Sequence, residues 1–213
     1  MFPILITEDL SDAYWPASNN GVAWRKGDID NLFTGIKAIS EINASSMLPA
    51  QQKGTISIWS KITANPSGFL RLNLCSEIWF NKCKQTLIDA ESKVDITGDC
   101  LVHGDMRSDN ICFKGHQSMF VDWSHASRGS KNYDLSMLLP TLYLEAGPLP
   151  FEIMPDGGRE ASLACARHIK RIADKQMPDW LRKIFLKLIA IELEWAAQCL
   201  QLSKPDGVTW QSL

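Results

Sequence analysis

The sequence has little of what marks several large classes of protein. Its 22 basic and 24 acidic side chains give a formal net charge of −2 and a pI near 6.1, so it lacks the basic surplus of a nucleic-acid-binding domain. No apolar run approaches the length of a membrane span. The opening MFPILITEDL has neither a basic start nor a small-residue cleavage site, so we expect no secretory signal peptide. These absences favour a cytoplasmic protein that binds neither nucleic acid nor membrane.

Paired cysteine spacing is also missing. The six cysteines stand at positions 75, 83, 100, 112, 165 and 199 within apolar segments, and no two of them form a CxxC motif. This pattern is typical of reduced, buried thiols and not of a disulfide framework or a zinc site. What the chain does have is 45% hydrophobic residues over 213 positions, which is enough to bury a sizeable core.

Hydrophobic periodicity predicts that most of the chain is helical. The helical patterns run from a capping Asp28 to Ile39, from about Leu72 to Ile88 with Ile78 on the buried side, from Asp134 to Leu144 with a bend or end near Pro140, over residues 158–173, and from Pro178 to about Leu202. Residues 44–68 and the segment GPLPFEIMPDGG are rich in proline and glycine, so we expect loops there.

Between residues 100 and 123 the pattern changes to short β-prone runs, CLVH, NICF and SMFVDW. Gly115 and its polar neighbours separate the last two runs, which predicts a β-hairpin. The run FPILIT near the N-terminus predicts one more short strand. The expected fold class is therefore α+β, mainly α, with a small β insert between helices.

The β insert carries the residues with chemical potential. His103, Asp105, Asn110 and Asp122 all lie within twenty residues of one another. An aspartate at a strand end can accept a proton from a hydroxyl nucleophile. An amide oxygen and a second carboxylate can share a hard cation such as Mg²⁺, which prefers a few oxygen ligands together with substrate phosphates. Phosphoryl transfer needs these parts, because its catalysis consists mainly of positioning and charge neutralisation.

The segment HGDMRSDN, followed by VDWSHASRGSKNYDLSMLL, resembles the aminoglycoside phosphotransferase and choline kinase-like family, a branch of the protein kinase fold. The specific match covers residues 99–139. The resemblance implies transfer of the ATP γ-phosphate to a hydroxyl of a small molecule with Mg²⁺. It implies that Asp105 is the catalytic base and that Asn110 and Asp122 bind the magnesium ion.

Three further roles follow from the same resemblance. Arg107 stands where protein kinases carry a lysine that faces the transferred phosphate, although an ion pair with Asp109 or a solvated position would explain it as well. His103 is expected to brace the catalytic and metal-binding loops against each other. Asp134 is expected to hold the backbone of the catalytic loop from a helix.

A weaker match covers LITEDLSDAYWP, which resembles the hinge strand that pairs with adenine, here near Glu8 and Leu10. The implied organisation is one kinase-like large-lobe domain over residues 1–213. It consists of a hinge strand (1–12), catalytic and metal-binding loops (99–134) and a helical substrate-side subdomain (135–213). In the family a small lobe precedes the hinge, and the sequence shows no counterpart to it. We therefore expect impaired ATP turnover, and homo-oligomers formed through an exposed hinge edge.

Alternative interpretations remain open at this point. The chain could be a non-catalytic remnant lobe that binds a partner, or a truncated gene start. The spacing of Asp122 and His125 could also indicate a metal-dependent phosphohydrolase, with His103 and Asp105 completing a two-metal cluster. That reading leaves Asn110 without a role. An acidic lining for a cationic substrate or a solvated helix face would equally explain a further set of residues, Glu145, Asp156, Glu160, Glu192 and Glu194.

Overall fold

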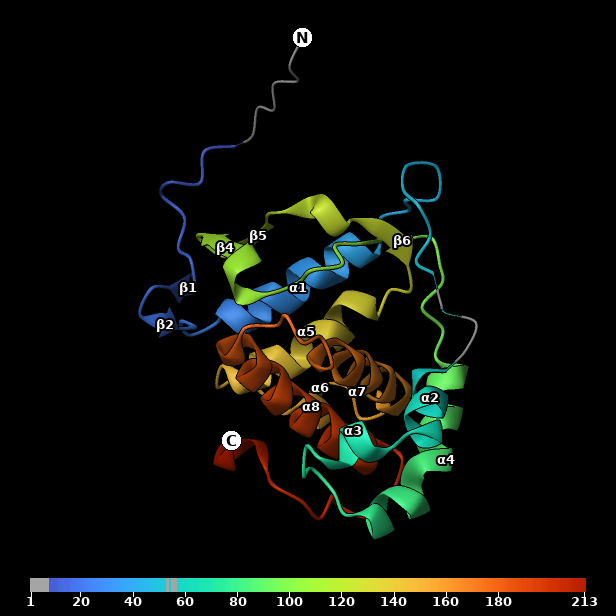
Figure 1. The fold of residues 1–213 in the computed structure, drawn as a ribbon. Helices are drawn as coiled ribbons and strands as arrows, with labels where there is room; N and C mark the ends of the chain where they lie inside the picture. The colour runs from blue at the N-terminus through green and yellow to red at the C-terminus, as the bar shows by residue number, and fades with distance from the viewer. Residues whose placement is uncertain (1–7, 53, 55–56) are drawn as a thin grey trace.

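The structure is a computed structural model that describes residues 8–52, 54 and 57–213. The long helices in this part of the chain are α1 (Asp28–Ser40), α4 (Glu77–Lys93), α5 (Tyr133–Leu144), α7 (Gly158–Ile172) and α8 (Asp179–Cys199). Shorter helices are α2 (Ile58–Ala64), α3 (Ser67–Leu70) and α6 (Pro150–Ile153). The expectation of an α+β chain that is mainly α is confirmed, and Figure 1 shows the arrangement.

The strands are short and pair two by two in antiparallel fashion. The pairs are β1 (Ala17–Ser18) with β2 (Gly21–Val22), β3 (Cys100–Val102) with β6 (Ser127–Gly129), and β4 (Ile111–Lys114) with β5 (Gln117–Phe120). The 3-10 turns are η1 (Ser108–Asn110), η2 (Trp123–His125) and η3 (Trp210–Ser212). The predicted hairpin is confirmed as β4–β5, with Gly115 at a positive φ of 60° in its turn.

Two apolar clusters hold these elements together. The larger one joins α4, α7 and α8 with Trp59 of α2, which is fully buried and donates from its indole to the Ser162 carbonyl at 2.9 Å. The smaller one lies under the β insert and contains Leu32 and Ile36 of α1 and Leu138 of α5. In Figure 1, α1 lies between the β4–β5 hairpin and α5. Helix α1 is therefore the platform on which the insert rests.

Several predicted loops contain helices. Residues 44–68 were expected to be irregular, but α2 and α3 form there. Glu91 of α4 supplies the reason, because its carboxylate accepts the amides of Ile58 and Trp59 at 2.8 and 2.9 Å and also the hydroxyl of Ser57. The start of α2 is thus held both by its N-cap Ser57, whose hydroxyl accepts the Ser60 amide at 3.1 Å, and by a distant carboxylate. The expected loop GPLPFEIMPDGG likewise contains α6.

Three local predictions are corrected as well. Asp28 does not cap α1, because Gly27 takes the N-cap position and the Asp28 carboxylate instead receives the amide and guanidinium of Arg25. Of the bend or end expected near Pro140, the end is wrong, because α5 continues to Leu144. Ile78, expected on the buried side of α4, is 70% exposed.

The N-terminal segment approaches the insert through Tyr14. The predicted strand FPILIT lies outside the described residues. The described remainder of the hinge segment, residues 8–12, forms no strand and ends in a turn. Tyr14 then exchanges backbone hydrogen bonds of 2.9 and 2.8 Å with Phe113 of β4. Within the described residues, no helix combines the length and the apolar character needed to cross a membrane.

Gly35 determines how closely the hairpin approaches α1. A Cβ atom at this position would lie 2.0 Å from Ser118 Oγ and 3.0 Å from the Phe120 ring. We predict that Gly35→Ala lowers the free energy of unfolding by about 1–2 kcal/mol in urea titrations. The overlap should outweigh the roughly 1 kcal/mol that alanine gains over glycine inside a helix.

Gly68→Ala in α3 is the matched control, because no atom lies within 4 Å of a Cβ built there. It should be neutral or stabilising. Adding Ser118→Ala to Gly35→Ala should recover part of the loss, since the overlapping hydroxyl is gone. A Gly35→Ala protein as stable as the Gly68→Ala control would contradict the prediction.

Candidate functional site

The loop between β3 and η1 is held in place by one buried carboxylate. Asp134, in the first turn of α5, is 5% exposed. Its Oδ2 accepts the His103 amide at 2.7 Å and its Oδ1 accepts the Gly104 amide at 2.9 Å. Burial raises the pKa of Asp134, and these two amides act in the opposite direction. The carboxylate thus satisfies loop backbone groups that no strand or helix partner reaches.

His103 connects this loop to the strand end before Asp122. Its side chain is fully buried, with Nε2 2.8 Å from the Val121 carbonyl and Nδ1 3.3 Å from the Asp105 amide. A carbonyl can only accept and an amide can only donate. The ring therefore carries its proton on Nε2 and accepts on Nδ1. The ring also packs on Trp123, with centroids 4.6 Å apart.

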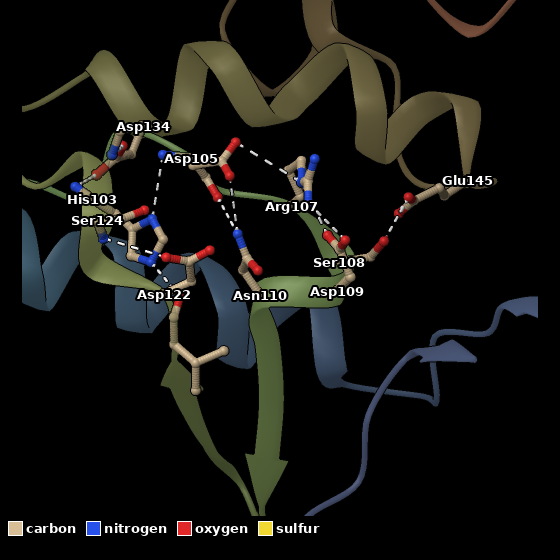
Figure 2. Close-up of polar contacts among 12 residues, drawn as sticks. His103, Asp105, Arg107, Ser108, Asp109, Asn110, Asp122, Ser124, Asp134 and Glu145 are labelled. Carbon is tan, nitrogen blue, oxygen red and sulfur yellow. Dashed lines mark hydrogen bonds and ion pairs between the residues drawn. The ribbon is translucent and has the colours of Figure 1, made fainter. Parts of the chain in front are cut away.

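Asp105 and Asn110 are in direct contact. Asn110 Nδ2 donates to the Asp105 backbone carbonyl at 2.9 Å and to Asp105 Oδ2 at 3.2 Å. Asn110 is buried at the end of η1, whereas the Asp105 carboxylate is about one third exposed. The amide orientation directs Asn110 Oδ1 away from Asp105, and this oxygen accepts no hydrogen bond from any described residue. Figure 2 shows the two side chains facing each other.

Asp122 follows β5 and adopts the left-handed backbone conformation, with φ 59° and ψ 65°. The hydroxyl and amide groups of Ser124 lower the pKa of this exposed carboxyl, with smaller contributions from His125 and His103. In the view of Figure 2 the Asp122 carboxylate lies between the His103 ring and the Asn110 side chain. The structure therefore presents two carboxylates and one free amide oxygen on the same two loops.

At Gly104 the two loops approach each other closely. It has a φ of 83°, and a Cβ atom there would lie 2.5 Å from the carbonyl oxygen of His125. A side chain at position 104 would force the loop that carries Asp105 away from the loop that carries Asp122. The spacing of the two carboxylates thus depends on this glycine.

Arg107 is found in the alternative arrangement that the sequence left open. Its guanidinium makes two hydrogen bonds to the Asp109 carboxylate, at 3.0 and 2.7 Å, and its Nε lies 3.9 Å from Asp105 Oδ1. All of this occurs at an exposed position. A role toward a phosphate stays a prediction.

The residues predicted for adenine lie at the start of the described chain. Glu8 is exposed and pairs with Lys114 at 2.8 Å, and the Leu10 carbonyl accepts the Ala13 amide at 3.1 Å. Lys114 also binds the Asp9 carbonyl at 3.2 Å, which ties this segment to the end of β4. The segment therefore lies against the β4–β5 hairpin, and its nucleotide role stays a prediction.

The acidic residues considered as a substrate lining do not form one group. Glu192 is fully buried in α8 and pairs with His168 at 2.8 Å, so it belongs neither to a solvated face nor to a lining. Glu145, at the end of α5, accepts the Ser108 hydroxyl at 2.7 Å beside the catalytic loop. Ser108 could not be recognised from the sequence, because a buried serine carries no distinguishing signal in a single sequence.

The donor set suits magnesium better than a softer metal. The Asp122 carboxylate and the free Asn110 oxygen are both hard oxygen donors, which Mg²⁺ prefers. Among the described residues, no three His, Cys, Asp or Glu side chains gather as a metal-binding group. The cluster of His103, Asp105, Asp122 and His125 needed for a two-metal phosphohydrolase is therefore not formed, and that alternative is disfavoured.

Comparison with known families gives one match. The model of the phosphotransferase enzyme family (APH) matches residues 89–169, a range that includes every site residue from His103 to Glu145. The resemblance predicted from HGDMRSDN and the segment after it is confirmed over these residues. A search of curated proteins finds no match to the chain.

The contact at Gly104 predicts a difference between two glycines with positive φ. Gly104→Ala should lower the free energy of unfolding by about 3 kcal/mol, because backbone strain and overlap with the His125 carbonyl add. Gly115→Ala, with no atom within 4 Å, should cost only about 1 kcal/mol. Urea titration of both variants tests this, and equal losses would contradict it.

Removing the Asp134 carboxylate should lower the free energy of unfolding. Asp134→Ala leaves the amides of His103 and Gly104 without an acceptor and should cost about 2–4 kcal/mol. Asp134→Asn should cost less, because its amide oxygen can still accept one of the two. Thermal and urea unfolding measure both values, and a neutral Asp134→Ala would show that the loop does not need this support.

Proposed function

We propose that this chain transfers the γ-phosphate of ATP to a hydroxyl of a small molecule. The family match over residues 89–169 indicates a phosphotransferase. The single observation that carries the finer proposal is the contact between Asp105 and Asn110, which pairs a proton acceptor with an amide whose oxygen is free.

Asp105 acts as the base in this proposal. Among the described residues, one of its oxygens accepts from Asn110 Nδ2, and the other has only the Arg107 guanidinium 3.9 Å away. Lone pairs on a partly exposed carboxylate are therefore left for the proton of a hydroxyl nucleophile. The Asn110 contact fixes the direction in which the carboxylate points, which is the positioning that phosphoryl transfer depends on.

Asn110 Oδ1 and the Asp122 carboxylate would hold Mg²⁺. Asp122 is an exposed aspartate, which is ionised at neutral pH and can serve as a ligand. Bound there, the ion would neutralise charge on the ATP phosphates. His103 keeps the two loops in register by bonding to both of them.

Two variants separate the proposed roles. Asp105→Asn should reduce phosphoryl transfer from ATP, measured with water as acceptor, by about 10²–10⁴-fold and leave Mg·ATP affinity within a few-fold. Asp122→Asn should weaken the binding of ATP in the presence of Mg²⁺ and change little in its absence, because one carboxylate ligand is lost. Calorimetry gives the affinities.

Asp30→Asn is the control, since Asp30 is exposed in the first turn of α1 and belongs to neither loop. It should match the wild type in both assays. An ATP affinity that does not respond to Mg²⁺, or that is the same in the wild type and in Asp122→Asn, would sink the proposal.

A further inference from the structure

We propose that Glu145 is a positioning residue, which fixes the catalytic loop through Ser108 and so sets the geometry between Asp105 and Asn110. This inference rests on the proposed function for its catalytic meaning. Its structural part concerns the loop alone and can be tested without turnover.

The two ends of α5 hold the two ends of the loop. Asp134 at the start of the helix binds the amides of His103 and Gly104. Glu145, the C-cap residue, accepts the hydroxyl of Ser108 at 2.7 Å. Figure 2 shows both acidic side chains reaching from opposite ends of this helix toward the loop beneath it. The 12 residues of α5 therefore act as a rigid spacer between two anchoring points.

The position of Glu145 is unfavourable unless its contact with the loop matters. A carboxylate at the C-terminal end of a helix meets the negative end of the helix dipole. Burial also raises the pKa of Glu145, and the Ser108 hydroxyl acts against this rise. Its second oxygen, Oε2, is buried without a hydrogen-bond partner among the described residues. Such a group is expensive to keep where only helix stability is at stake.

Trp24 also lies near this carboxyl. Its indole Nε1 is also buried without a partner at hydrogen-bonding geometry among the described residues, yet it lowers the Glu145 pKa as a nearby donor. The Trp24 ring packs edge-on against Phe113, with centroids 6.4 Å apart, and Phe113 lies in β4 directly after the loop. Glu145 thus sits between the loop and the segment that precedes α1.

A shift of Ser108 would reach the reacting groups within two residues. Ser108 and Asn110 are the first and last residues of the short turn η1, so they move together. Asn110 in turn orients the Asp105 carboxylate through its Nδ2. Loss of the Glu145 contact should therefore disturb the direction of the base while leaving its chemical identity intact.

Amide hydrogen exchange over residues 105–110 tests this directly. Glu145→Ala and Ser108→Ala should each raise exchange of these amides by at least about tenfold relative to the wild type. Glu145→Gln should stay close to the wild type, because an amide oxygen can still accept the Ser108 hydroxyl. This rescue separates the hydrogen bond from the charge.

Glu192→Gln is the matched control. Glu192 is also a buried glutamate with an unpartnered Oε2, but it lies in α8 and pairs with His168. Once each value is corrected for global stability, this variant should leave loop exchange unchanged. Loop exchange in Glu145→Ala that equals the corrected value for Glu192→Gln would overturn the inference, and so would Glu145→Gln behaving like Glu145→Ala.

Turnover gives a second readout wherever the wild type transfers phosphate. Glu145→Ala should then lower kcat at least about tenfold with little change in the KM for ATP, and Glu145→Gln should retain most of kcat. Equal effects on kcat and KM would speak against a positioning role. Should the wild type fail to bind Mg·ATP, the proposed function fails, and loop exchange still decides whether Glu145 positions the loop.

Discussion

The geometry of the site depends on the satisfaction of backbone amides in a loop that has no regular structure. The segment after β3 turns away from its strand partner, so its N–H groups need acceptors from elsewhere. Asp134 provides both acceptors for His103 and Gly104 from a single buried side chain. Without it the loop would have to open to water. The position of Asp105 therefore depends first on this carboxylate.

The second loop is brought into place by packing and by one imidazole ring. The β4–β5 hairpin packs on α1 with Gly35 at the contact. This packing fixes the position of the end of β5 and therefore of Asp122, which follows it. His103 then forms a hydrogen bond with the Val121 carbonyl, directly after β5. Packing of the hairpin on the helix brings the two loops near each other, and the hydrogen bonds of the buried His103 then fix their relative position. Sequence motifs alone describe neither step, although they identify the residues involved.

Features with local causes could be predicted from the sequence, and features with distant causes could not. The hairpin at Gly115 follows from turn chemistry, and the helices at residues 28–40 and 158–172 follow from periodicity. Helix α2 was missed because its first turn depends not only on its N-cap Ser57 but also on Glu91, which comes much later in the chain. Strand β6 was missed for a similar reason, since SRG becomes a strand only by pairing with β3. In the site, motif spacing predicted that Asp105 and Asn110 act together, and the two side chains are in contact. The partners of Arg107 and Glu145 depend instead on how the chain folds back.

The backbone conformation at position 122 limits which residues can replace Asp122. A residue with φ near 59° and ψ near 65° is in the left-handed region, which glycine, asparagine and aspartate enter most readily. Glutamate, although it carries the same charge, would meet both this strain and a longer side chain. Of these three residues, aspartate brings a charged side-chain oxygen to the site, asparagine brings a neutral one, and glycine brings none. Among substitutions compatible with this backbone, only aspartate and asparagine keep a side-chain oxygen at the site. They differ in charge, so evolutionary change at position 122 that keeps the oxygen changes the charge of the site.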